Sequence, residues 1–209
     1  ASMTQLLDSV LQEHGQIRVV VMEFAHFRSR PQVAAVDFGS LVRELVRNRS
    51  RLLDCCRNSE TLDSAIAAYI WHLSYDFEVG PFMRIYFLLK TNGLGEHQKF
   101  IARAGRTWKG LSQGVGVWRC EAAHTNPIVA AAHGVVTSDS VRRVKEAQRA
   151  FWYEVQKDEW LRIWLPEKQR AFGMSEVKKG ASLSNAWGNN GERYASGAFG
   201  LFKMCGEIV

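Results

Sequence analysis

The segment from His97 to Cys120 has the residue types best suited to a chemical task. It reads HQKFIARAGRTWKGLSQGVGVWRC, with five Lys or Arg residues, two Trp residues and no acidic residue. Cationic side chains bind phosphate oxygens, and an indole ring offers a face on which a base can stack. The segment therefore predicts a surface for a phosphate backbone. The competing interpretation is a helix whose solvated side happens to be basic.

Two other segments repeat basic residues at helical spacing. Residues four apart lie on the same face of a helix, so each group predicts a basic stripe. Stripes brought together by the fold would form an electrostatic groove for nucleic acid, bound mainly through its phosphates. The predicted nucleic-acid-binding residues are Arg43, Arg47, Arg51, Lys99, Arg103, Arg106, Trp108, Lys109, Trp118, Arg119, Arg142, Arg143 and Arg149.

The whole-chain composition agrees with an anionic partner. Lys and Arg number 27 against 21 Asp and Glu, which gives a net charge of +6 and a pI near 9.3. No apolar run approaches the roughly 20 residues that span a bilayer, so we expect no membrane partner. The start of the chain lacks the pattern of a signal peptide, and its four cysteines form no CxxC pair. We expect an intracellular, reducing compartment, the cytoplasm rather than the nucleus.

Catalytic chemistry is the alternative. His72 and Asp76 would share one face of an expected helix, and Glu23 lies close to His26 in the sequence. Either pair could serve as an acid–base element. Such pairs also arise by chance, and a histidine beside Trp71 is typical of a core position.

Metal and cofactor motifs are weak. Cys120 and His124 are followed by His133, but a structural zinc site needs four converging ligands, usually including a paired CxxC or HxxxH. The segment GLGEH lacks a dinucleotide fingerprint, and GRTWKG lacks the ending of a P-loop. We expect neither a metal nor a cofactor.

The elements that must position these residues are mostly helical by periodicity. Helices are expected up to Gly15, over 37–56, from 59 to about 75, from His97 to about 113, over 127–133 and over 139–165. The segment PFMRIYFLLK fits either a buried helix or a strand, and we favour a helix. The expected fold class is predominantly α, a single compact helical domain, with a possible minor β element near residues 17–27 and 115–120.

The chain divides most easily near residue 136. We expect a helical domain with a basic face over 3–136, and a long helix plus a Gly-rich arm over 137–209, packed on the same core. The arm alternates glycines with apolar residues, which require a surface to cover. Its own domain and a second copy both remain open. The predicted oligomerisation residues are Tyr194, Phe199, Leu201 and Phe202.

Together these features predict a non-enzymatic protein that binds nucleic acid, single-stranded RNA in the first place, as a packaging or assembly component. A homo-oligomer is expected. Two alternatives stay open: a small soluble enzyme that uses a His/acid pair on an anionic substrate, and a protein-assembly module with no nucleic acid.

Overall fold

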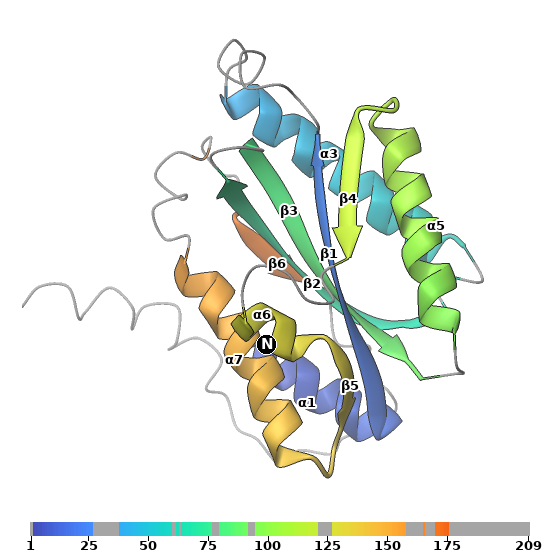
Figure 1. The fold of residues 1–209 in the computed structure, drawn as a ribbon, viewed down its shortest axis with the longest axis vertical. Coiled ribbons are helices and arrows are strands. Elements are labelled where there is room, and N and C mark those ends of the chain that lie inside the picture. The colour runs from blue at the N-terminus through green and yellow to red at the C-terminus, as the bar shows by residue number, and fades with distance from the viewer. Residues whose placement is uncertain are drawn as a thin grey trace, which may run out of the picture. The chain divides into compact units, whose positions relative to one another are not determined.

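The computed structural model describes residues 2–26, 38–59, 62, 64–76, 80–91, 95–120, 127–157, 165 and 170–175, all within the compact unit Ser2–Val177. At its centre is an antiparallel sheet with strand order β4-β1-β3-β2-β6, and β5 pairs with β1 beside β4 (Figure 1). The strands are β1 (Gln16–His26), β2 (Ile66–Asp76), β3 (Gly80–Lys90), β4 (Gly116–Cys120), β5 (Gly134–Thr137) and β6 (Phe172–Met174).

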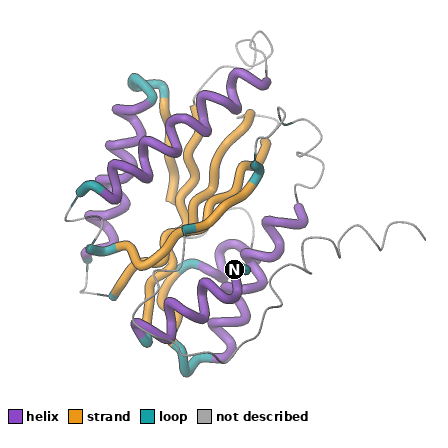
Figure 2. Tube along the Cα trace, turned by 180° about the vertical axis from the view of Figure 1, so that it is seen from behind, coloured by secondary structure: helices purple, strands orange, loops and turns teal. Residues whose placement is uncertain are grey.

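Helices cover both faces of this sheet. Alternate residues of a strand point to opposite faces, and Val20, Met22 and Phe24 of β1 pack with α3 (Phe38–Arg57) and α5 (Glu96–Leu111). The alternate residues Ile17, Val19 and Val21 of β1 pack on the other face with α1 (Met3–His14), α6 (Pro127–Ala132) and α7 (Val141–Lys157). Figure 2 shows from behind how the strands lie between the two groups of helices. No helix of the described residues is long and apolar enough to cross a membrane.

The expectation of a predominantly helical chain is wrong, because a six-stranded antiparallel sheet organises the described residues. The segment expected to be a helix from 59 to about 75 is mostly β2, and PFMRIYFLLK lies within β3. Both strands are buried on both faces, so apolar residues fill almost every position and match a helical period as well as a strand period. The elements expected near 17–27 and 115–120 are β1 and β4, and β1 is an inner strand rather than a minor element.

The helices expected up to Gly15 and over 37–56, 97–113 and 127–133 are present with close to the expected bounds. Of the helix expected over 139–165, the structure describes α7 (Val141–Lys157), and residues 158–164 lie outside the described residues. Ser2 caps α1 through a capping box with Gln5, in which the Ser2 hydroxyl accepts from the Gln5 N–H and the Gln5 side chain accepts from the Ser2 N–H. The expected division after residue 136 falls inside β5, which pairs with β1. The predicted oligomerisation residues Tyr194, Phe199, Leu201 and Phe202 lie outside the described residues.

A row of charged side chains crosses the sheet on the α7 side. Glu23 of β1 and His72 of β2 are both direct cross-strand partners of Arg84 on the central strand β3. The Arg84 Nε donates to Glu23 Oε1 at 2.9 Å, and its guanidinium also pairs with Glu154 of α7. Glu154 Oε2 lies 3.2 Å from His72 Nδ1, and Glu23 also pairs with Arg119 of β4. One buried arginine therefore links two strands and a helix.

We predict that Arg84→Met destabilises the fold strongly. Glu23 and Glu154 are only 4% and 2% exposed, so removal of Arg84 leaves two buried carboxylates without the cation between them. Breaking a buried ion pair from one side costs about 3–5 kcal/mol, which urea denaturation would measure.

The matched control removes all three charges together, as Glu23→Leu, Arg84→Met and Glu154→Leu. Replacing buried ion pairs by apolar residues is often close to neutral, so this variant should regain a large part of the lost stability. The exposed Arg119 stays solvated, whereas the buried His72 loses its neighbour Glu154, which limits the recovery. A cost for Arg84→Met below about 1 kcal/mol would contradict the assigned role of this arginine.

Candidate nucleic-acid interface

The first basic row lies on α3. Leu41, Leu45 and Leu52 face the sheet and are buried, which turns the opposite side of the helix towards solvent. Arg43, Arg47 and Arg51 occupy that opposite side, and all three are exposed. Four residues advance a helix by about 6 Å, so the row places cations at that spacing over about 12 Å.

The second basic row lies on α5. Phe100, Ala104 and Trp108 are buried against the same core cluster as the inner side of α3. The remaining side of the helix is exposed to solvent. Its exposed cations are Lys99, Arg103, Arg106 and Lys109.

These two rows belong to one layer, because α3 and α5 pack against each other on the same face of the sheet (Figure 1). The Cys56 thiol of α3 illustrates this proximity: burial raises its pKa to about 12, while the neighbouring Arg103 of α5 acts in the opposite direction. The sequences of the two helices contain nine Lys or Arg residues and three Asp or Glu residues. We call the exposed cations of α3 and α5 the basic layer: Arg43, Arg47, Arg51, Arg57, Lys99, Arg103, Arg106 and Lys109.

The two tryptophans predicted for base stacking have different environments. Trp108 is fully buried, its indole N–H donates to the Ala25 carbonyl at 3.1 Å, and it stacks on His26 with the ring centroids 5.4 Å apart. This corrects its predicted role, because a base cannot reach a ring held in the core. Trp118 of β4 is 38% exposed. It lies against α5, where a Cβ on Gly105 would come within 2.0 Å of the Trp118 Cε2 atom.

The predicted cations of α7 lie on the other side of the sheet. This helix packs with α1 and α6, so Arg142, Arg143 and Arg149 do not join the basic layer. Arg143 donates to three backbone carbonyls around β5 and pairs with Glu146, which Arg142 also binds. Arg119 points to this side too, where it pairs with Glu23. The fold therefore brings together two of the three predicted stripes.

The residue pairs considered for catalysis are separated by the strands on which they lie. Glu23 and His26 are three apart on β1 and point to opposite faces: Glu23 pairs with Arg84, whereas His26 Nδ1 lies 3.7 Å from Glu44 Oε1 of α3. His72 and Asp76 are four apart on β2, which corresponds to about 13 Å along a strand. Neither pair forms an acid–base unit.

The interaction of Arg84 with Glu154 was not predicted from the sequence. The available signal was Arg84, the one charged residue inside the apolar run FMRIYFLL. An unpaired buried charge is costly, so a charge at such a position requires a buried partner of opposite sign. The identity of that partner depends on where α7 packs, which no local pattern indicates.

Metal coordination has no support among the described residues, which contain no group of three or more His, Cys, Asp or Glu side chains that could hold an ion. His124, considered as a ligand with Cys120, lies outside the described residues. No protein-family model, curated protein or solved structure matches the chain. A functional assignment therefore rests on the geometry of the chain itself.

We predict that the two tryptophans differ in their contribution to stability. Trp108→Ala should cost about 3–5 kcal/mol, because it removes a large core side chain and leaves a cavity. Trp118→Ala should cost clearly less, about 1–2 kcal/mol, because part of its ring already contacts water. Urea denaturation of both variants gives the comparison, and equal losses would contradict the assignment of Trp118 to the surface.

Proposed function

We propose that the chain binds single-stranded nucleic acid, RNA in the first place, through the basic layer on α3 and α5. The observation that carries this proposal is the position of two exposed basic rows on neighbouring helices of one face. Cations arranged in this way attract a phosphate backbone and release its condensed counterions, which supplies affinity without sequence preference.

A single strand is favoured over a duplex by Trp118. Its half-exposed ring lies against α5, so a strand bound to the basic layer would have an aromatic surface within reach of its bases. Stacking of a base on an aromatic side chain contributes about 1–3 kcal/mol and tolerates any base. Packaging or assembly, with a homo-oligomer formed through the C-terminal arm, stays a prediction.

We predict steep salt dependence for binding to a fluorescently labelled 20-nucleotide RNA, followed by anisotropy. If six cations of the basic layer each contact a phosphate, log K should fall against log salt with a slope of about −4, at about −0.7 per contact for a single strand. The variant Arg47→Ala/Arg51→Ala/Arg103→Ala should reduce this slope to about −2 and weaken binding by at least about tenfold near 0.1 M salt. The same titration with DNA of the same sequence compares the two sugars.

The matched control is Arg142→Ala/Lys145→Ala/Arg149→Ala on α7, which removes the same charge from exposed positions across the sheet. This variant should keep the slope and most of the affinity of the unmodified protein. Equal weakening by the two triple variants would show that only the net charge matters, and an absence of binding even at low salt would contradict the proposal outright.

A further inference from the structure

The edge of β1 contains a gap between two partner strands. β5 pairs with Gln16–Val19 and β4 pairs with Met22–His26, which leaves Val20 and Val21 between them. The backbone N–H of Val21 is satisfied by a side chain, because it donates to Nδ1 of His133 at 3.3 Å. The neutral imidazole of His133 therefore carries its proton on Nε2, which remains available as a donor.

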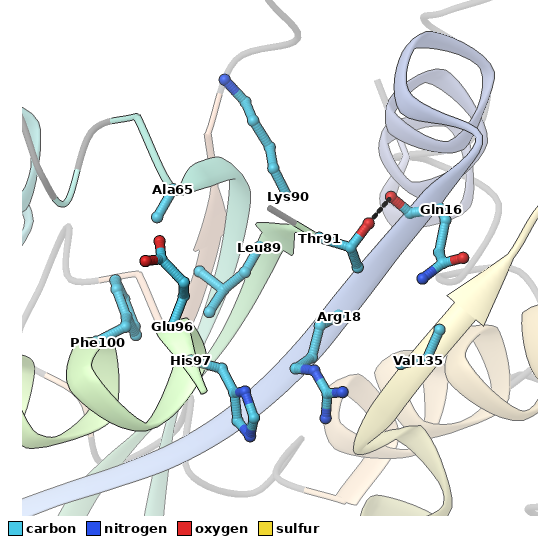
Figure 3. Close-up of a pocket in the computed structure, with 10 residues that line it drawn as sticks. All are labelled: Gln16, Arg18, Ala65, Leu89, Lys90, Thr91, Glu96, His97, Phe100 and Val135. Carbon is cyan, nitrogen blue, oxygen red and sulfur yellow. Dashed lines mark hydrogen bonds between the residues drawn. The ribbon is translucent and has the colours of Figure 1, made fainter. Parts of the chain in front are cut away.

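A pocket of about 200 Å³ lies between the start of β1 and the start of α5. Arg18, Lys90 and His97 are among its lining residues, and Glu96 is the one acidic residue among them. Figure 3 shows the side chains of Arg18 and His97 directed towards the same side, while the Glu96 carboxylate points away from them towards Ala65. Small pockets of this size suit a small ion better than a drug-sized molecule, which typically needs about 300 Å³ or more.

The start of α5 adds positive potential to this pocket. Gly95 occupies the N-cap position with no side-chain hydrogen bond, so the first N–H groups of the helix receive no side-chain cap. These groups carry the positive end of the helix dipole. His97 lies in the same first turn, next to Arg18 of β1.

The cationic side chains around the pocket disfavour one another's positive charge. Burial, followed by the charge of Arg18, lowers the pKa of His97. Burial, followed by Arg18, His97 and Arg143, lowers the pKa of His133. The side chains of Arg18, Lys90 and His97 make no hydrogen bond or ion pair with any residue that the structure describes. An anion between Arg18 and His97 would satisfy their donors and relieve the repulsion between these two side chains.

We propose that the pocket at the start of α5 binds a phosphate group. Arg18, His97 and the first N–H groups of α5 supply the donors. The site does not require the basic layer. The phosphate could come from two sources. One is the end of a bound nucleic-acid strand; this source rests on the proposed function, because Lys99 and Arg103 of the basic layer continue along the same helix. The other is a free phosphate or a mononucleotide.

The first test compares 5′-phosphorylated with 5′-hydroxyl RNA by anisotropy, and titrates inorganic phosphate and adenosine monophosphate by calorimetry. If a strand end is bound, the 5′-phosphate should increase affinity roughly tenfold, as one charge-assisted hydrogen bond or more would. If a free anion is bound, phosphate or the mononucleotide should give a saturable isotherm without a preference among the RNAs. Arg18→Gln/His97→Gln should abolish whichever effect is seen.

The matched control His14→Gln/Arg149→Gln changes the same two residue types on α1 and α7, and it should retain the effect. Salt-dependent binding of 5′-hydroxyl RNA should be the same in both double variants. If this binding is present but no phosphate effect is seen in the unmodified protein, the proposed phosphate site is wrong, while the proposed role of the basic layer stands. Loss of RNA binding with a retained phosphate isotherm would support the pocket alone.

A second measurement is independent of affinity for RNA. A bound phosphate favours the protonated imidazole, so saturating inorganic phosphate should raise the pKa of His97 in NMR titrations of the ring protons. The ring signals of His14, on α1, serve as the internal reference. An unchanged pKa for His97 would overturn the proposal.

Discussion

The ion pairs of Arg84 are the constraint on which the rest of the structure depends. Its guanidinium lies on the central strand and is held between Glu23 of β1 and Glu154 of α7, all three side chains being almost fully buried. A slip of one residue in the pairing of β1 with β3 would turn these charges to opposite faces of the sheet. The network therefore specifies both the strand register and the face on which α7 packs.

This constraint gives the two helical layers different roles. On the α7 side, several charged groups are used within the fold: Arg119 pairs with Glu23, and Arg143 donates to backbone carbonyls around β5. On the opposite side, the cations of the basic layer on α3 and α5 are exposed to solvent. The layer of α3 and α5 therefore presents the larger group of exposed cations among the described helices.

The sequence predicted the helices and the exposed stripes well, because an amphipathic helix repeats its apolar residues at a period that local reading detects. It failed for β2 and β3, where burial on both faces removes the alternation that marks a strand. Trp108 and Trp118 could not be distinguished, since each stands directly before a basic residue, Lys109 or Arg119. Their difference depends on whether α5 or the sheet edge covers the ring.

The stripes show the same division between local and tertiary information. Each stripe could be assigned to one face of its helix from spacing alone. Arg47 and Arg103 share a layer, whereas Arg149 lies across the sheet. This arrangement depends on the order of the strands in the sheet, which no local sequence pattern indicates. The acceptor role of His133 at the gap in β1 is likewise a consequence of two strands pairing with one edge.

The central claim is that one layer of the molecule receives the nucleic acid. Photo-crosslinking to an RNA that contains 4-thiouridine, with the attached peptides identified by mass spectrometry, tests it most directly. Binding to the basic layer predicts crosslinks in Phe38–Arg57, in Glu96–Leu111 and at Trp118, and their loss when unlabelled RNA competes. Crosslinks confined to Val141–Lys157, across the sheet, would contradict it.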